Sequence, residues 1–345
     1  MNESDNVVIK AVDLKKHFEA KLGLLDTLMR RKILIRAVDG VSIWVKKGEI
    51  LGLAGESGSG KTTLGRTLLR LIEPTSGHIY FRDLEITRLS KRELKRIRPK
   101  IQIIFQDPFE SVNPRMTVYD VVAEGLRINR RVLGVKSEKD IEEMVKQALA
   151  LVQLVPPEQF LNRYPHELSG GQRQRVAIAR ALVLKPEFIV ADEPVSMLDV
   201  SIRAEVLNVM MDLKDKLGLS FLMITHDLAL AKHVCDRLAI MYLGKIVEMG
   251  NAEEVINQPL HPYTQALIAA IPSGDPEGRK VKVLAKGEVP SSVNIPNGCR
   301  FHPRCPYAKE LCARVEPELR SVGNEHYVAC HYYEEALSYF KSQNA

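Results

Sequence analysis

A glycine-rich loop, an acidic pair and a histidine are the residues of this sequence best suited to phosphate chemistry. Residues 55–62 read GESGSGKT and fit the pattern G-x-x-x-x-G-K-[ST], a loop whose backbone N–H groups cradle phosphates. Lys61 would reach the β- and γ-phosphates of a nucleotide, and the Thr62 hydroxyl would bind Mg²⁺. The expected nucleotide contacts here are Gly55, Glu56, Ser57, Gly58, Ser59, Gly60, Lys61, Thr62 and Thr63.

The acidic pair Asp192-Glu193 follows the apolar run Phe188–Ala191 and precedes Pro194. A carboxylate at a strand tip beside a phosphate loop can bind Mg²⁺ directly or through water, so Asp192 is a candidate metal ligand. Glu193 could polarise an attacking water. A solvated turn is the alternative for a lone Asp-Glu pair, and the buried run before this pair favours the catalytic interpretation.

The pentapeptide LSGGQ at residues 168–172 indicates a second way to bind an anion. It precedes a helix whose apolar residues Val176, Ala179 and Val183 fall on one face. Hydroxyl and amide donors at the positive end of a helix bind anions readily. The candidate residues are Ser169, Gly170, Gly171 and Gln172.

Short apolar runs that alternate with amphipathic helical stretches must position these groups, and they predict α/β units around a largely parallel sheet. The runs Ile50–Ala54, Phe188–Ala191 and Phe221–Ile224 are typical of buried strands. Each delivers polar residues at its carboxyl end, where open α/β sheets bind ligands. Residues 61–71 and 200–217 have helical periodicity.

Two regions depart from this alternation. From about residue 107 to 165 the pattern predicts charged-face helices and no strand, hence a helical subdomain inserted in the sheet domain. Beyond about residue 260 the chain becomes rich in Pro, Gly and Ser, which predicts a separate accessory region. We therefore expect a nucleotide-binding domain at 1–260 and an accessory domain at 261–345.

The bulk composition limits the alternatives. The 345 residues are 45% hydrophobic and 27% charged, which fits one large domain with an appendage, or two domains. A net charge of +6 is too weak to indicate nucleic acid, and the basic run 91–100 is typical of a solvated helix face. No apolar run reaches the roughly 18 to 20 residues that span a bilayer, and the acidic start is unlike a secretory signal. We expect a cytosolic protein.

Four of the five cysteines stand in the last fifth of the chain with the spacing C-x5-C-x6-C-x17-C. A disulfide framework is not expected in a reducing compartment. Four thiolates suggest a metal, yet the zinc knuckle C-x2-C is absent, so the spacing leaves a metal site and unligated cysteines both open. The remaining Cys235 lies in a helical stretch and is expected to be core.

Six motifs in order resemble those of an ATP-binding subunit of an ABC transporter. They are the phosphate loop (Walker A), FQDP at 105–108, LSGGQ, the strand with its acidic pair (Walker B), SMLD at 196–199, and His226. This resemblance covers nearly the whole chain. It implies a P-loop NTPase (RecA-like) core with a parallel sheet, an antiparallel β subdomain, an inserted α-helical subdomain, and a C-terminal accessory region with the cysteine cluster.

The resemblance also implies roles for single residues. Gln106 would contact Mg²⁺ or the attacking water, and His226 would contact the γ-phosphate. Asp199 would lie in a loop that crosses between subunits, and Ser169 would face the γ-phosphate held by the opposite subunit. Phe18 would stack on adenine, with a core position as the alternative. The implied catalytic residues are Glu193, His226, Gln106 and Lys61, and the implied Mg²⁺ ligands are Thr62, Gln106 and Asp192.

Finer matches resemble the ATPases of oligopeptide and dipeptide importers. They are FQDPFESVNPRMT at 105–117, NRYPHELSGGQRQR at 162–175 and HPYTQAL at 261–267. A long segment between Phe18 and Ala37 resembles the F-type member of their ATPase pair. ATP would close a dimer and hydrolysis would reopen it. The branch also implies four cysteines that hold a [4Fe–4S] cluster, here Cys299, Cys305, Cys312 and Cys330, with zinc as the alternative.

The implied partners are a D-type ATPase paralogue, two transmembrane permease subunits and, indirectly, an extracellular substrate-binding protein. The subunit would be peripheral, at the cytoplasmic face of the cell membrane. Oligosaccharide or nickel cargo and a homodimer remain open. A soluble ABC ATPase of translation or DNA repair is the alternative from another functional class, although neither a second ATPase unit nor a long insertion is present.

Overall fold

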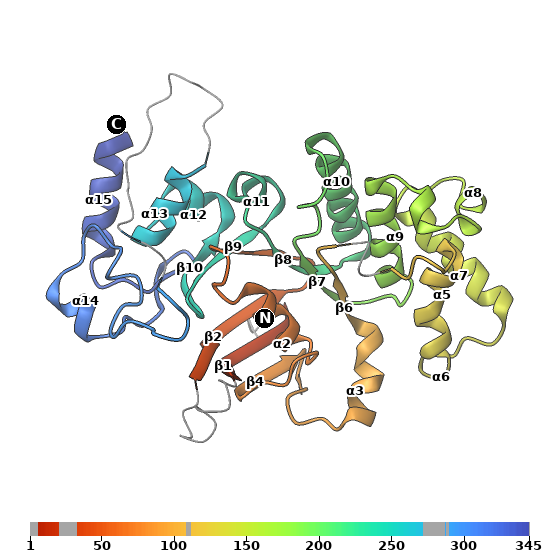
Figure 1. Ribbon diagram of the computed structural model, residues 1–345, viewed down its shortest axis with the longest axis horizontal. Helices are drawn as coiled ribbons and strands as arrows, with labels where there is room; N and C mark the ends of the chain where they lie inside the picture. Colours follow the sequence, from red (N-terminus) through yellow and green to blue (C-terminus); the bar gives the residue numbers. More distant parts are fainter. Residues whose placement is uncertain (1–5, 21–32, 108–111, 272–286, 288–289, 345) are drawn as a thin grey trace. The chain divides into compact units, whose positions relative to one another are not determined.

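The computed structural model describes residues 6–20, 33–107, 112–271, 287 and 290–344, and these form two compact units (Figure 1). The acidic-pair unit consists of Met1–Ile9, Trp44–Ile50 and Tyr80–Ile224. The phosphate-loop unit consists of Lys10–Ile43, Leu51–Ile79 and Thr225–Ala345. None of the helices within the described ranges is long and apolar enough to cross a membrane.

A parallel sheet forms the centre of the acidic-pair unit. Its strands are β6 (Ile101–Ile104), β7 (Phe188–Asp192) and β8 (Ser220–Ile224), with β7 in the middle. Every residue of β7 and β8 is buried, as expected for parallel strands covered on both faces. The strands predicted at 188–191 and 221–224 are confirmed.

Helices make up most of the remaining acidic-pair unit. Among the described residues from 112 to 165 there are helices and no strand, as the sequence pattern predicts. The helices α5 and α7 pack on each other and on α9, and they bury apolar faces such as Val121, Val122 and Leu126. The helices of this unit are α3 (Lys91–Ile97), α5 (Val118–Ile128), α6 (Arg130–Leu133), α7 (Glu138–Leu151), α8 (Glu158–Leu161), α9 (Gly170–Leu182) and α10 (Val200–Leu217).

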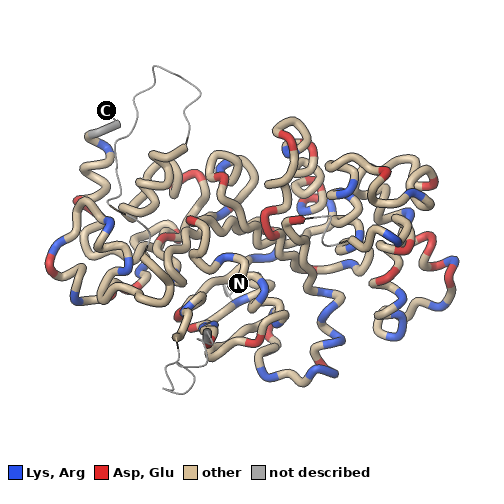
Figure 2. Tube along the Cα trace, in the orientation of Figure 1, with Lys and Arg blue, Asp and Glu red and all other residues tan. Residues whose placement is uncertain are grey.

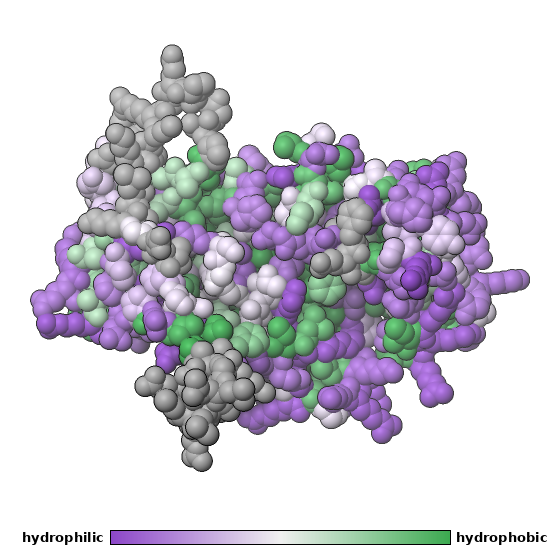
Figure 3. Space-filling view, viewed as in Figure 1, coloured by the Kyte–Doolittle hydropathy of each residue, from purple (hydrophilic) through white to green (hydrophobic). Residues whose placement is uncertain are grey.

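The basic run 91–100 forms α3 and the short 3₁₀ turn Arg98–Lys100. Only Leu94 of α3 is buried, and Lys and Arg lie along the helix (Figure 2). Hydrophilic residues also cover most of the surface over α7 and α8 (Figure 3). The interpretation of 91–100 as a solvated helix face is thus confirmed.

The phosphate-loop unit contains a sheet with strands from both ends of the chain. The strand order is β11-β12-β10-β9-β3; β3 is parallel to β9, and the other neighbouring pairs are antiparallel. β3 begins and ends where the sequence predicts. The bounds are β3 (Ile50–Ala54), β9 (Arg237–Tyr242), β10 (Lys245–Asn251), β11 (Arg320–Gly323) and β12 (His326–Val328).

The two last strands were not predicted, because they are short and polar. β12 pairs with β10 through Glu248↔Val328 and Met249↔Tyr327, so the C-terminal region continues the sheet. The helices of this unit are α2 (Lys61–Leu68), α11 (Leu228–Val234), α12 (Ala252–Asn257), α13 (Pro262–Ala269), α14 (Glu310–Arg314) and α15 (Tyr333–Asn344). α2 ends three residues before the predicted residue 71, because Arg70 adopts a left-handed backbone conformation with φ 50°.

A second sheet corresponds to the β subdomain expected from the sequence. Its strands β1 (Val7–Ala20), β2 (Ile33–Lys46) and β4 (Ser76–Phe81) lie in the order β2-β1-β4. At its end β4 forms an antiparallel pair with β5 (Leu84–Glu85). Residues 21–32 of the predicted F-type segment between Phe18 and Ala37, and residues 108–111 of the predicted motif at 105–117, lie outside the described residues.

Candidate nucleotide site

The phosphate loop joins β3 to α2, and two of its glycines, Gly55 and Gly60, are required by the close approach of other strands. A Cβ atom on Gly55 would lie 2.1 Å from the carbonyl oxygen of Met241, and one on Gly60 would lie 2.0 Å from that of Ala37. Both glycines also have positive φ, 151° and 107°. The loop is therefore held against β9 on one side and β2 on the other.

Lys61 is the first residue of α2 and lies folded across the loop. Its side chain is buried, and Nζ donates hydrogen bonds to the carbonyl oxygens of Gly55 at 2.7 Å and Glu56 at 3.0 Å. No acidic residue stands in the first turn of α2, so the positive end of the helix dipole is not neutralised there. Thr62 and Thr63 follow in the same turn. This arrangement suits a polyphosphate.

The expected adenine-stacking residue, Phe18, lies on β1 in the same unit as the loop. It is 36% exposed, so it is not part of the core. Lys16 Nζ lies 4.9 Å from its ring centroid. The neighbouring His17 lies with Nε2 2.9 Å from Oδ1 of Asp39.

In the acidic-pair unit, Asp192 ends β7 and is 2% exposed. Glu193 follows with φ 47°, a left-handed conformation that is uncommon for a residue other than glycine. Its backbone N–H donates to the carbonyl oxygen of Ile224 at 3.0 Å, and its own carbonyl accepts the N–H of Ser196 at 3.2 Å. Backbone strain of this kind clusters at functional sites, where the surrounding structure holds it.

Gln106 forms a direct side-chain contact with Glu193. Its side-chain amide Nε2 donates to Glu193 Oε2 at 3.0 Å. The two residues are separated by 87 positions in sequence. They meet because each lies beyond the carboxyl end of a strand, β6 or β7, and these strands are parallel neighbours. The structure thus brings together the predicted water-contacting glutamine and the predicted base.

LSGGQ forms the N-terminus of α9. Ser169 Oγ accepts the N–H of Gln172 at 3.3 Å, and Gln172 Oε1 accepts the N–H of Ser169 at 3.1 Å, a reciprocal capping box. Ser169 itself is exposed. Gly171 is buried, and a Cβ there would lie 2.5 Å from Ile202 Cγ2. The pentapeptide therefore places an exposed hydroxyl at the positive end of a 13-residue helix.

The remaining predicted residues also follow strands or begin helices. Asp199 is exposed at the N-cap of α10, where its side chain makes no capping hydrogen bond. His226 is exposed two residues after β8. The next residue, Asp227, caps α11 through the N–H of Leu230 at 3.0 Å. The acidic-pair unit thus carries Gln106, Ser169, Gly170, Gly171, Gln172, Asp192, Glu193 and Asp199, and the phosphate-loop unit carries Phe18, residues 55–63 and His226.

The four C-terminal cysteines line one small cavity in the phosphate-loop unit. Burial raises the pKa of the Cys299 thiol to about 11 and that of Cys330 to about 12, so both are neutral thiols near pH 7 without a metal. Within the described ranges no three His, Cys, Asp or Glu side chains are arranged as a preformed metal site. Cys235 is buried under Gly52, and its expected core position is confirmed.

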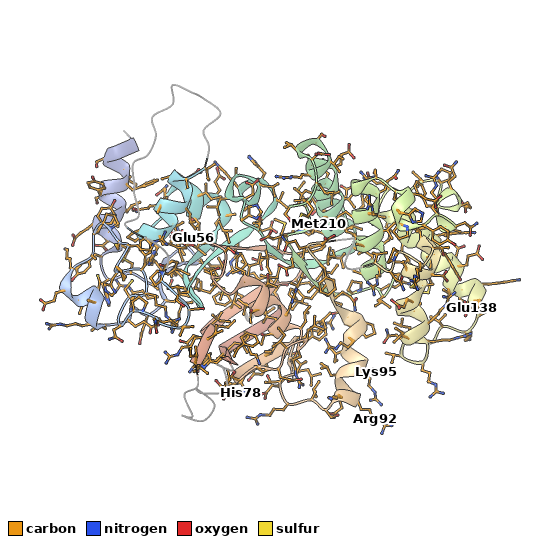
Figure 4. The ribbon with its side chains drawn as sticks, in the orientation of Figure 1. Glu56, His78, Arg92, Lys95, Glu138 and Met210 are labelled. Carbon is orange, nitrogen blue, oxygen red and sulfur yellow. The ribbon has the colours of Figure 1, made fainter. Side chains whose placement is uncertain are left out.

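Two contacts to the phosphate loop were not predicted from the sequence. Arg304 donates to both carboxylate oxygens of Glu56, and the Tyr263 hydroxyl accepts the backbone N–H of Glu56 at 2.8 Å. Figure 4 shows Glu56 close to α13, which carries Tyr263. The hydrogen bond to Glu56 raises the pKa of Arg304. Since these partners lie about 200 residues or more from the loop, no local pattern reveals them.

Residues 38–196 match the family described as ABC transporter, and residues 247–312 match the family described as oligopeptide/dipeptide transporter, C-terminal region. A putative peptide import ATP-binding protein of Brucella ovis is 50% identical over 89% of this chain and 95% of its own length. The oligopeptide transport ATP-binding protein AppF of Bacillus subtilis is 46% identical over 96% and 98%, and OppF of Escherichia coli is 45% identical over 96% and 97%.

Solved structures give the same result. The ATP-binding cassette MJ0796, as a dimer bound to ADP and Pi, matches with a TM-score of 0.61 and 30% identity over 71% of this chain and 98% of its own. The protein cbiO1 of Clostridium perfringens matches with a TM-score of 0.61 and 28% identity over 73% and 92%. Fold and site define an ABC-type ATPase. The chain belongs to the ATP-binding subunits of the oligopeptide/dipeptide branch of ABC transporters, a class that works with membrane permease subunits.

Proposed function

We propose that this protein binds and hydrolyses ATP to drive peptide import, with two ATPase subunits sharing each nucleotide. The hydrogen bond from Gln106 to Glu193, on a strained backbone beyond β7, carries the chemical part of the proposal. Glu193 is the base that takes a proton from the attacking water, and Gln106 orients that water. General-base catalysis of this kind contributes about 10²- to 10⁴-fold in rate.

The other residues bind and orient the nucleotide. Phe18 stacks on adenine, and the backbone N–H groups of residues 55–63 hold the phosphates. Lys61 exchanges its carbonyl partners for the β- and γ-phosphates. Thr62, Gln106 and Asp192 would hold Mg²⁺, which would neutralise charge that develops on the phosphates. His226 contacts the γ-phosphate.

The exposed Ser169 hydroxyl supports a composite site. It caps α9 and faces solvent, as a donor for a phosphate held by a second subunit requires. Gly170, Gly171 and Gln172 complete that anion site, and Asp199 contacts the partner. ATP binding closes the dimer, and loss of the γ-phosphate on hydrolysis reopens it. The relative MJ0796 is described as a dimer in a post-hydrolysis state, which supports this cycle.

The proposed assembly joins this subunit to a D-type paralogue and to two transmembrane permease subunits at the cytoplasmic face of the membrane. An extracellular binding protein supplies the cargo, and the names of the relatives and of the C-terminal family support oligopeptides or dipeptides as that cargo. We retain 1–260 as the nucleotide-binding domain, with its helical subdomain at about 107–165, and 261–345 as the accessory domain. Co-purification of the tagged subunit with its permease neighbours tests the assembly; a stable complex with RNA or DNA instead would contradict it.

We also propose that Cys299, Cys305, Cys312 and Cys330 hold a [4Fe–4S] cluster. The chemistry of the donor set supports this proposal, because all four thiols line one cavity, and the nearby Cys299, Cys305 and Cys312 each raise the pKa of Cys330. When bound, the cluster would supply covalent cross-links between the segments that carry the four cysteines. The cavity volume is only about 20 Å³, so the cysteines must move apart for a cluster, whereas a single zinc ion would need less movement.

Metal analysis of anaerobically purified protein tests this part. Four iron and four acid-labile sulfide per chain are expected for a cubane cluster. One zinc per chain without sulfide would replace the cluster by a zinc site. Absence of both metals from protein with four titratable thiols would contradict any resident metal.

A further inference from the structure

An arginine of the segment 299–305 contacts the phosphate loop. Arg304 Nη1 donates to Glu56 Oε2 at 2.8 Å, and Nη2 donates to Oε1 at 3.1 Å. The side chains are only 10% and 29% exposed. A bidentate, largely buried pair of this kind fixes the geometry of both partners.

Aromatic rings hold Arg304 in place. Its guanidinium carbon lies 5.9 Å from the ring centroid of Tyr242 and 5.7 Å from that of Phe301. The ring of Phe301 in turn packs against Tyr263, at 5.4 Å between centroids. Since the Tyr263 hydroxyl accepts the N–H of Glu56, the C-terminal region holds Glu56 through both its side chain and its backbone.

This contact reaches the lysine that binds phosphate. Lys61 Nζ donates to the carbonyl oxygen of Glu56 at 3.0 Å. A displacement of Glu56 therefore moves one of the oxygens that place the ammonium group. It also changes the path of the backbone N–H groups that face the phosphates.

A second arginine of the same segment reaches the opposite end of the nucleotide site. The Arg300 guanidinium donates to the carboxylate of Asp39 and to the carbonyl oxygen of Leu243. Asp39 contacts His17, which directly precedes Phe18 on β1. Arg300 is thus linked through Asp39 and His17 to the strand that carries the aromatic residue expected to stack on adenine.

We propose that residues 299–305 form a clamp that positions the nucleotide site at both ends. Arg304 positions the phosphate loop, and Arg300 positions the strand that carries Phe18. Both are positioning residues that act through other side chains. Because Cys299 and Cys305 lie at the two ends of the clamp, the arrangement of the cysteines affects nucleotide affinity, an effect that rests on the proposed metal site.

The affinity of a fluorescent ADP analogue tests the phosphate end. Arg304→Gln and Glu56→Gln should each weaken binding about tenfold, the scale of one charged hydrogen-bonded pair. The double variant should bind no more weakly than the weaker single variant, since both changes remove one interaction. Arg314→Gln is the control, because Arg314 pairs with exposed Glu310 in the same region and should bind like the wild type.

Arg304→Lys separates geometry from charge. It keeps the positive charge but loses the fork that engages both oxygens, so it should bind with intermediate affinity. Arg304→Lys also tests the clamp if the Arg304→Gln variant does not fold. Unchanged affinity in a folded Arg304→Lys or Arg304→Gln variant, or strictly additive losses in the double variant, would overturn the clamp at this end.

Competition experiments separate the two ends. Arg300→Gln should weaken binding of the ADP analogue while leaving competition by inorganic tripolyphosphate unchanged, since tripolyphosphate has no adenine. Arg304→Gln should weaken both. Equal effects of Arg300→Gln on the two ligands would contradict a role at the adenine end.

Removal of the resident metal tests the link to the cysteines. Wild type and Arg304→Gln are compared as isolated and after anaerobic chelation, with circular dichroism as the check on folding. Chelation should weaken ADP-analogue binding several-fold in the wild type and clearly less in Arg304→Gln, because the contact is already lost there. Equal losses of affinity in the two proteins would contradict the link between the cysteines and nucleotide binding. If the isolated protein contains no metal, the cysteine site fails while the Arg304 and Glu56 variants still decide the clamp.

Discussion

At the scale of single residues, Glu193 combines a left-handed backbone with a hydrogen bond from Gln106. Glu193→Gln keeps an oxygen that can accept this hydrogen bond and removes the carboxylate that we propose takes the proton. We expect ATP hydrolysis to fall about 10²- to 10⁴-fold, with nucleotide affinity little changed. Steady-state hydrolysis and equilibrium binding measure the two effects.

Glu187→Gln is a suitable control for that variant. Glu187 pairs with Arg82 and Lys100 in the same unit and has no part in the proposed chemistry. Its turnover should remain close to that of the wild type. Comparable turnover in Glu193→Gln would remove Glu193 as the base.

The glycines of the phosphate loop are required for two different physical reasons, and a pair of variants separates them. Gly58 has φ 77° and open space around a Cβ, whereas a Cβ on Gly60 would strike the carbonyl oxygen of Ala37. Gly58→Ala should lower the free energy of unfolding by about 1–2 kcal/mol, the penalty for a left-handed backbone at a residue with a Cβ atom. Gly60→Ala should cost clearly more, because backbone atoms must move. Denaturant midpoints measure the difference; equal costs would contradict the close packing of the loop against β2.

At the scale of elements, α9 begins with a residue that has two separable roles. Ser169→Ala should destabilise the protein by about 1 kcal/mol through loss of the cap. Ser169→Asp restores a capping acceptor but places a negative charge where the γ-phosphate of a partner's ATP would bind. Stability should therefore recover in Ser169→Asp while hydrolysis does not. Recovery of hydrolysis as well would indicate that Ser169 only caps the helix.

β1 and β2 are joined by a carboxylate whose ionisation should affect stability in acid. Burial raises the pKa of Asp39, but hydrogen bonds from Arg300 and His17 outweigh it and hold this pKa below 3.8. A lowered folded-state pKa gives stability that is present above the ordinary value and is lost as pH falls through the folded value. The difference in urea midpoint between the wild type and Asp39→Asn should thus be largest near neutral pH. It should shrink as the pH falls below about 3.8 and through the lower pKa of the folded state. A gap that does not change with pH would assign the effect to packing.

The sequence pattern predicts the buried elements best. β3, β7 and β8 are continuous apolar runs, so burial and strand propensity agree, and α10 ends at the predicted Leu217, where Gly218 follows with φ 65°. β11 and β12 are short and polar, and they become strands only because β10 offers an edge to pair with. The contacts of Arg304 and Glu56 likewise depend on distant packing, which no local pattern contains.

At the scale of the whole molecule, Glu248 joins the C-terminal region to the sheet of the phosphate-loop unit. This residue of β10 is 0% exposed. Its carboxylate accepts the N–H of Leu260 at 2.8 Å and of His261 at 2.9 Å, and its Oε1 lies 2.8 Å from His326 Nε2. The region after residue 260 therefore completes the hydrogen bonding of a buried acid within the unit that carries the phosphate loop.

Loss of one hydrogen-bond partner should leave the buried Glu248 carboxylate with an unsatisfied acceptor. His326→Ala is expected to destabilise the protein by about 2–3 kcal/mol, because a buried carboxylate loses a hydrogen bond that no water can easily replace. His331→Ala is the matched control, since His331 is more exposed and its Nε2 lies 2.9 Å from the backbone carbonyl oxygen of Val315 rather than from a buried carboxylate. Urea unfolding of both variants measures the difference. If His326→Ala were as stable as the control, the C-terminal region would contribute little to the stability of the nucleotide-binding sheet.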